Sequence, residues 1–222
     1  MSFENAMAVV YGAAGQLGSA VARALARERA FVFLADRSQD AVNTLEHQIA
    51  EEGGVAEATP VDLLDHTAVQ EYSADIAAWS GGVDIALSVL EAAHLPHIEP
   101  AHLSGRSPAD RLSAAESSIA RANIAHMAAR HSGLIVLITR EILVNPEMSS
   151  LVREADAQGI RLRLVPRSRF IRGATPPHHR RKIRPSPIPP AALDGFAREL
   201  VSWTSRLAAG THTEPIAERP LE

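Results

Sequence analysis

The chain has 222 residues, no Cys, a single Lys and two Tyr. With 46% apolar and 22% charged residues, its composition is that of an ordinary globular protein. The lack of Cys excludes disulfides, zinc–thiolate sites, iron–sulfur clusters and a cysteine nucleophile. No apolar run reaches the ~18 residues of a membrane span, and the first residues lack the pattern of a signal peptide. We therefore expect a cytoplasmic protein with no membrane partner.

Apolar runs of strand length alternate with helical stretches along the chain. Strands are predicted at 7–11, 31–35, 55–61, 83–89, 134–139 and 160–165, and helices at 15–29, 39–52, 66–79, 108–131, 146–157 and 191–207. Strands that alternate with helices predict a parallel sheet covered on both faces, and the strands are expected to be buried apolar runs. The expected fold class is α/β, a Rossmann-like doubly wound parallel sheet in three layers (α/β/α).

The same pattern predicts how the chain is organised. Residues 1–165 are expected to form a dinucleotide-binding Rossmann domain, and 166–190 an Arg/Pro-rich loop on its substrate side. A helix over 191–210 belongs to the same domain, and 211–222 form a tail.

The first strand runs into a glycine loop that opens a helix. Gly12, Gly15 and Gly18 form a G-x-x-G-x-x-G pattern in this strand–turn–helix context. Gly12 allows the tight turn, Gly15 lets a pyrophosphate approach the backbone, and Gly18 lets the helix pack closely on the sheet. The loop predicts a dinucleotide site whose residues are Gly12, Ala14, Gly15, Gln16, Leu17 and Gly18.

Acidic residues at the ends of the next two strands extend this site. Asp36 ends the second strand, 24 residues after Gly12, where a carboxylate accepts hydrogen bonds from an adenosine ribose and disfavours a 2′-phosphate. This favours NAD over NADP, although the adjacent Arg37 could soften the preference. Asp62 and Leu63 follow the third strand and are expected near the adenine. The alternative is a tight-turn glycine set and two strand-end acids that bind no ligand.

These segments resemble the short-chain dehydrogenase/reductase superfamily. The stretch VVYGAAGQLGSAVARALARERAFVFLADRS at 9–38 is similar to its first βαβ unit, and VDLLD at 61–65 to its adenine segment. GGVDIAL at 81–87, ANIAHMAARHSGLIVLIT at 122–139 and QGIRLRLVPRSRFIRG at 158–173 are similar to later family segments. The glycine pattern is closest to the extended and atypical branches. The resemblance implies an oxidoreductase that binds NAD(P).

The residues that carry out the family's chemistry are missing. The family uses a Tyr as general acid/base with a Lys four residues later, and a Ser after the fifth strand. Here Tyr11 and Tyr72 are followed four residues later by Gly and Ile, the only Lys is Lys182, and the Ser position holds Thr139 or Arg140. After the fourth strand, Ser88-Val89-Leu90-Glu91 replaces the family's Asn-Asn-Ala-Gly. The expected protein is therefore non-catalytic or atypical, with a homo-oligomer or a related subunit in a hetero-oligomer as expected assemblies.

Other residues offer substitute chemistry. His94 and His97 lie with Glu91, Glu99 and His102 after the fourth strand, where parallel sheets bind ligands. They are interpreted as solvated loop residues, as a substitute acid/base because imidazole titrates near neutrality, or as a metal site whose spacing matches no known pattern. Arg140 could bind an anionic substrate group or the nicotinamide carboxamide, or form a surface ion pair. No metal site is predicted.

Basic residues concentrate near the C-terminus. The net charge is −4, yet 157–193 contain nine basic residues and no acidic one. Arg167, Arg169, Arg172, Arg180, Arg181, Lys182 and Arg184 could bind an anionic ligand such as a coenzyme A or carrier-protein substrate, or neutralise the acidic remainder of the protein. Nucleic acid is disfavoured because Phe170 is the only aromatic residue among them. Arg161 and Arg163 on the last strand are expected to need acidic partners.

Overall fold

The computed structural model describes residues 3–91, 107–139, 146–166 and 190–209. Its centre is a parallel sheet of six strands: β1 (Met7–Tyr11), β2 (Phe31–Asp36), β3 (Val55–Pro60), β4 (Ile85–Ser88), β5 (Gly133–Thr139) and β6 (Ile160–Pro166). They are arranged in the order β3-β2-β1-β4-β5-β6. The order reverses between β1 and β4, which is the switch point where doubly wound sheets bind ligands at their carboxyl edge.

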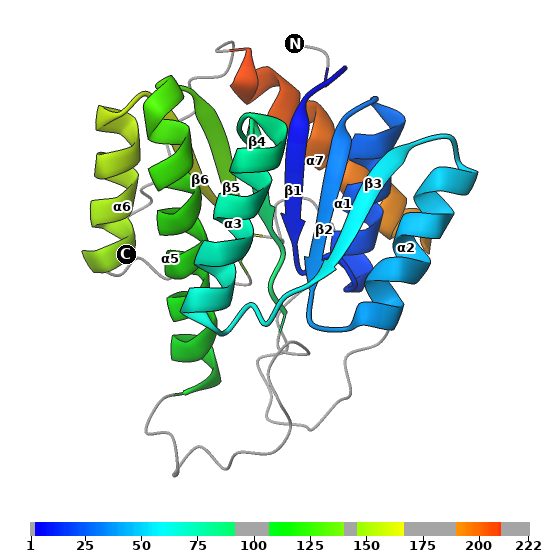
Figure 1. The fold of residues 1–222 in the computed structure, drawn as a ribbon. Coiled ribbons are helices and arrows are strands. Elements are labelled where there is room, and N and C mark those ends of the chain that lie inside the picture. Colours follow the sequence, from blue (N-terminus) through cyan, green and yellow to red (C-terminus); the bar gives the residue numbers. More distant parts are fainter. Residues whose placement is uncertain (1–2, 92–106, 140–145, 167–189, 210–222) are drawn as a thin grey trace, which may run out of the picture.

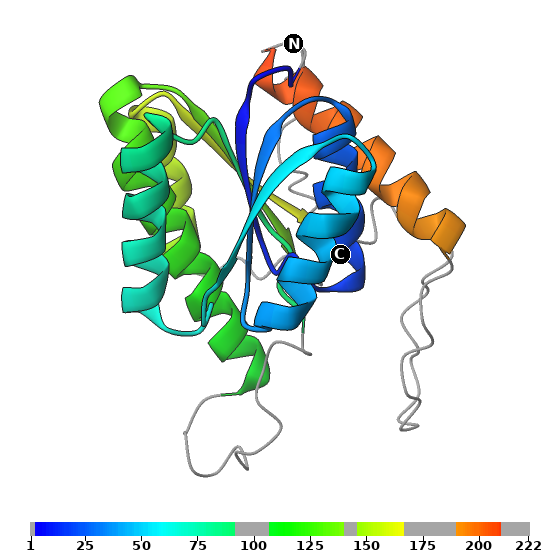
Figure 2. The same ribbon diagram turned by 45° about the vertical axis from the view of Figure 1, so that its right-hand side comes forward.

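Two layers of helices cover the sheet, one on each face (Figures 1 and 2). One layer contains α1 (Gln16–Arg27), α2 (Gln39–Glu51) and α7 (Pro190–Ala208). The other contains α3 (His66–Ser80), α5 (Pro108–Met127) and α6 (Pro146–Ala157), and a short 3-10 turn, η2 (Ala128–Arg130), follows α5. The predicted three-layer α/β/α architecture is confirmed. None of the helices in these described ranges is both long and apolar enough to cross a bilayer.

The helices begin and end where local chemistry places them. Ser38 and Asp65 cap α2 and α3 through side-chain oxygens that accept from first-turn N–H groups. Ser107 and Asp110 form a capping box at the start of α5, as its Ser-Pro-x-Asp sequence predicts. α3 ends at Gly81, whose φ of 74° is left-handed. α5 ends at Met127, earlier than the predicted end at residue 131, because the last turn is the 3-10 segment η2.

β3 departs from the expectation of buried apolar strands. It is the edge strand, its burial alternates between exposed and partly buried, and Val55 is 56% exposed. Ala56 and Ala58 contact the apolar layer beneath α2, whereas Glu57 on the opposite face is exposed. The sheet is therefore doubly covered in its centre but only singly covered at this edge.

The structure corrects the expected partners of the β6 arginines. Arg161 binds no carboxylate among the described residues; its Nη1 donates to the carbonyl oxygens of Leu207 at 2.6 Å and Ala208 at 3.1 Å, at the end of α7. A cation at a helix C-terminus satisfies carbonyls that have no partner inside the helix and complements the helix dipole. Arg163 does reach an acid, Asp156 of α6, at 3.6 Å.

Replacing Arg161 should therefore destabilise the docking of α7. We expect Arg161→Met, which keeps an apolar stem, to lower the free energy of unfolding by about 1–3 kcal/mol, because a charged donor to backbone carbonyls is lost. Arg163→Met, which removes a partly exposed ion pair, should cost less than about 1 kcal/mol. Urea denaturation of both variants checks this, and equal losses would contradict the capping role of Arg161.

Candidate functional site

The glycine loop has the geometry that its sequence predicts. Gly12 adopts a left-handed φ of 84°, and a Cβ on Gly18 would overlap the carbonyl group of Gly12. α1 therefore approaches the end of β1 as closely as two backbones allow. Gly15 is the N-cap of α1 in ordinary extended backbone (φ −68°, ψ 161°). It offers no capping side chain, and the first turn contains no acidic residue.

Most amides of the loop itself are used within the protein. The N–H groups of Gly12 and Ala13 donate to the carbonyl of Ala35 at 2.8 and 3.2 Å, and that of Gly15 donates to the carbonyl of Gly12 at 3.3 Å. These bonds fix the loop to the end of β2. A phosphate would then be held by first-turn amides of α1, such as those of Leu17 and Gly18, because first-turn N–H groups have no acceptor inside a helix.

Asp36 is joined directly to this loop. Its Oδ2 accepts from the N–H of Ala14 at 3.1 Å and its Oδ1 from that of Ser38 at 3.5 Å, and the residue is 5% exposed. The carboxylate thus lies beside the glycine turn, as a ribose-binding group must. Arg37, the next residue, is exposed.

Of the two residues predicted near the adenine, one is exposed and the other is buried. Asp62 is exposed and its Oδ1 accepts from the N–H of Leu64 at 3.0 Å, which fixes the turn that precedes α3. Leu63 is 3% exposed and its side chain packs in the core between the sheet and α3. Only the backbone of Leu63 is therefore available to a ligand.

Several candidates from the sequence fall outside the part of the chain that the structure describes. His94, His97 and Arg140 lie outside the described residues, as do Glu99, His102 and the basic segment from Arg167 to Arg184. Within the ranges that the structure describes, no group of three His, Asp or Glu side chains comes together to hold a metal ion.

Neither tyrosine is available to a substrate. Tyr11 is fully buried; its hydroxyl lies 2.9 Å from Ser73 Oγ and accepts from Asn123 Nδ2 at 3.0 Å. Tyr72 is 7% exposed and meets the ring of Tyr11 edge-on, with the centroids 6.1 Å apart. Burial raises the pKa of both phenols above the usual value of 10, so both remain neutral structural groups near neutral pH.

Sequence reasoning missed one titratable residue of the α5 layer. Glu116 is partly buried on α5, and desolvation raises the pKa of its carboxyl from 4.5 to about 7. In the structure Glu116 continues the stripe of α5 formed by the buried residues Ala120, Asn123 and Met127, at the spacing i, i+4, i+7 and i+11.

Glu116 should make stability depend on pH. A carboxyl whose folded-state pKa is raised binds its proton more tightly in the folded than in the unfolded chain, so stability falls as pH rises from about 4.5 through about 7. Relative to Glu116→Gln, the wild type should lose about 2–3 kcal/mol of unfolding free energy between pH 5 and pH 8. Urea denaturation at both pH values checks this. Glu154→Gln, at an exposed position of α6, serves as the control. If wild type and Glu116→Gln differ in unfolding free energy by the same amount at pH 5 and pH 8, the raised pKa of Glu116 is contradicted.

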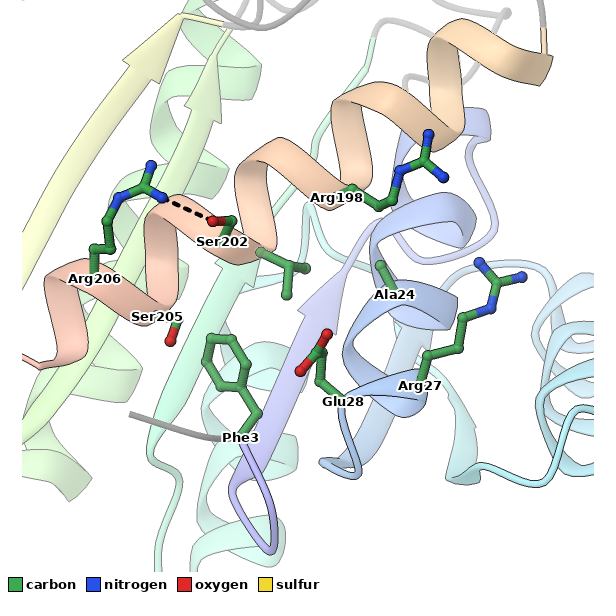
Figure 3. Close-up of a pocket in the computed structure, with 9 residues that line it drawn as sticks. Phe3, Ala24, Arg27, Glu28, Arg198, Ser202, Ser205 and Arg206 are labelled. Carbon is green, nitrogen blue, oxygen red and sulfur yellow. Dashed lines mark hydrogen bonds between the residues drawn. The ribbon is translucent and has the colours of Figure 1, made fainter.

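A groove lies elsewhere, between α7 and α1. It has a volume of about 540 Å³ and is lined by α7, the C-terminal end of α1 and Phe3. Figure 3 shows Arg27, Arg198 and Arg206 on its rim, with Phe3 and Glu28 between the helices. Since Arg27 is at the far end of α1 from Gly15, roughly 18 Å along a 12-residue helix, this groove is not part of the glycine-loop site.

Comparison with known proteins agrees with this geometry. The family model for short chain dehydrogenase matches residues 6–148. The meso-2,3-butanediol dehydrogenase of Serratia marcescens is 34% identical over 88 residues, 40% of this chain and 34% of that protein. The 2,3-dihydro-2,3-dihydroxybenzoate dehydrogenase of Bacillus subtilis (strain 168) is 35% identical over 86 residues, 39% of this chain and 33% of that protein. The chain thus matches about a third of the length of these relatives.

Solved structures share the fold over more of the chain. A metagenomic short-chain oxidoreductase in complex with NADP superposes with a TM-score of 0.67 at 23% identity, covering 92% of each chain. NAD⁺-bound xylitol dehydrogenase superposes with a TM-score of 0.56 at 19% identity, covering 74% of this chain and 70% of that one. Together with the glycine loop and its fixed aspartate, the family match over 6–148 establishes that the chain belongs to the short-chain dehydrogenase/reductase family.

Proposed function

We propose that the chain binds NAD(H) at the glycine loop and operates without the tyrosine–lysine pair that the family uses. One observation carries the binding proposal: the Asp36 carboxylate accepts from the N–H of Ala14, 3.1 Å away. This hydrogen bond holds a ribose-binding carboxylate beside the glycine loop. The helix that follows the loop has its N-terminus where a pyrophosphate would bind.

The glycine positions support this fit. Gly18 has no room for a side chain, and Gly15 leaves the helix N-terminus without a capping side chain. Phosphate oxygens would accept from first-turn amides, and Asp36 would accept from ribose hydroxyls. The bound dinucleotide would supply an acceptor or a donor for a hydride. Asp36 favours NAD because its charge opposes a 2′-phosphate, while the neighbouring Arg37 limits that preference.

The proposal has two forms that differ in turnover. In the first, the chain is a non-catalytic family member that serves as a regulatory or partner subunit, because no Tyr-x-x-x-Lys occurs anywhere in its sequence. In the second, it is an oxidoreductase with another acid–base group, for which His94, His97 and Arg140 were the candidates from sequence. An anionic ligand on the basic segment after β6 remains a separate hypothesis, tested by the salt dependence of binding.

A stability measurement tests the binding proposal. A ligand that binds only the folded state raises the unfolding free energy by RT ln(1 + [L]/Kd). NADH at 100 times its Kd should therefore stabilise the chain by about 2.7 kcal/mol, and NADPH at the same concentration by less. No stabilisation by either nucleotide would contradict the proposal. Dehydrogenase assays on a panel of alcohols with NAD⁺ then separate its two forms.

A further inference from the structure

Three polar side chains lie where α5 passes the carboxyl ends of β4 and β5. These are Glu116 on α5 and the hydroxyls of Ser88 and Thr139 on the last residues of these two strands. Ser88 is 1% exposed and Thr139 is 5% exposed. Neither hydroxyl has a hydrogen-bond partner among the residues that the structure describes. Buried hydroxyls without a partner are rare, and they point to a ligand or water that completes them.

Both hydroxyls are on the face of the sheet that α3, α5 and α6 cover. Side chains alternate between the faces of a strand, and Ala86 and Leu137, each two residues earlier, belong to the core cluster of the α3–α5–α6 layer. Ser88 and Thr139 therefore face the same layer. β4 and β5 are adjacent, and Ser88 is in register with Leu137, so the hydroxyls stand on neighbouring strands near the same edge.

Glu116 lies on the stripe of α5 that faces the sheet. Two residues of this stripe have known contacts: Asn123 donates to Tyr11 of β1, and the side chain of Met127 lies against Gly133 at the start of β5. Glu116 precedes them by 7 and 11 residues, which returns it to the same side of a helix. Glu116 therefore lies on the side of α5 that faces the sheet, where it is partly buried.

The position of Glu116 along the helix brings it level with the two hydroxyls. Eleven residues of helix between Met127 and Glu116 span roughly 16 Å. The same distance along β5 from Gly133 covers about five residues and ends near Ile138 and Thr139. α5 runs antiparallel to β5 (Figure 1). By these lengths, Glu116 is therefore level with the ends of β4 and β5.

Glu116 forms no ion pair with the described residues, and burial is the cause of its raised pKa. On the sheet, the residues of β1, β4 and β5 in this layer are uncharged. On α3, the imidazole Nδ1 of His66 lies 2.7 Å from Ser118 Oγ. On α6, Glu147 is held by Arg121 of α5 at 3.1 Å. The carboxyl is thus a proton-binding group on the largely apolar side of α5 that faces the sheet, and the hydroxyls of Ser88 and Thr139 can both donate and accept.

We propose that Glu116 is the acid–base group of this chain and exchanges a proton with the oxygen of an alcohol or carbonyl substrate, with Thr139 and Ser88 as hydrogen-bonding partners. The inference rests on the proposed function, since the dinucleotide takes up or supplies the hydride. In alcohol oxidation the O–H proton passes to the carboxylate of Glu116 and the C–H hydride to NAD⁺, which leaves a carbonyl compound and NADH. In reduction, protonated Glu116 returns the proton to the carbonyl oxygen as NADH supplies the hydride.

The first test observes Glu116 directly. Carboxyl carbon NMR of glutamate-labelled protein should show one resonance that titrates near pH 7 and disappears in Glu116→Gln. Titration of that resonance below pH 5 would overturn the proposal. NADH should bind Glu116→Gln within about twofold of wild type, because Glu116 is on the opposite side of the sheet from α1. If wild type does not bind NADH, the proposed function fails independently of the NMR result.

The second test is turnover. On a panel of secondary alcohols with NAD⁺, wild-type activity should rise as pH increases through about 7, since the carboxylate is the base in oxidation. Glu116→Gln should reduce kcat by about 10²–10⁴-fold, the usual contribution of general acid–base catalysis, and Glu154→Gln should have no effect. Turnover of Glu116→Gln at the wild-type rate would overturn the proposal, and so would absence of NAD⁺-dependent oxidation by the wild type.

Discussion

Gly15→Trp is expected to weaken NADH binding by at least about 100-fold while leaving the fold intact. Gly15 has a backbone conformation that any residue adopts, so the substitution introduces no strain. Its side chain would instead occupy the space where a pyrophosphate meets the N-terminus of α1. A 100-fold loss corresponds to about 2.7 kcal/mol of binding free energy. Calorimetric titration gives the affinity, and thermal unfolding reports on the fold.

Ala192→Trp is the matched control for this variant. Ala192 is exposed in the first turn of α7, so the same bulky side chain is added away from the glycine loop. We expect wild-type affinity for NADH in this variant. Retention of tight NADH binding by Gly15→Trp would show that the nucleotide, if bound at all, does not use the glycine loop.

Asp36→Asn is expected to reverse the choice between the two nucleotides. The asparagine amide oxygen can still accept from the N–H of Ala14, so the turn is preserved, but the negative charge is lost. Without that charge a 2′-phosphate is no longer repelled, and the exposed guanidinium of Arg37 can attract it. The ratio of NADPH to NADH affinity should rise by about 10–100-fold.

The double variant Asp36→Asn/Arg37→Ala shows which group increases the affinity for NADPH. If Arg37 holds the 2′-phosphate, most of the increase in NADPH affinity should disappear when its guanidinium is removed. An unchanged nucleotide preference in Asp36→Asn would contradict the position that we assign to the adenosine ribose.

The fold was predictable because its determinants are local. The glycine loop, the strand-length apolar runs and the Ser-Pro-x-Asp cap of α5 each act within a few residues. The contacts that refine the site are long-range and leave no local pattern. Asp36 reaches Ala14 across 22 residues, and Arg161 reaches Leu207 across 46, to a carbonyl that any residue would supply.

The acid–base candidate Glu116 also depends on long-range contacts. In the sequence it is one of several charged residues on an Ala- and Ser-rich helix. It becomes a candidate only when Asn123 and Met127 show which side of α5 faces the sheet, and when Ser88 and Thr139 are seen to end adjacent strands. The sequence search for a substitute acid/base favoured histidines, because their usual pKa is near neutrality. A buried carboxyl reaches the same range through desolvation, which depends on tertiary structure.

Calorimetric titration of the purified wild-type chain with NADH tests the central claim most directly. The account predicts saturable binding of one NADH per chain, weaker binding of NADPH, and a heat signal that vanishes in Gly15→Trp. Absence of NADH binding at millimolar concentration would show that the chain has kept the family's scaffold without its nucleotide site.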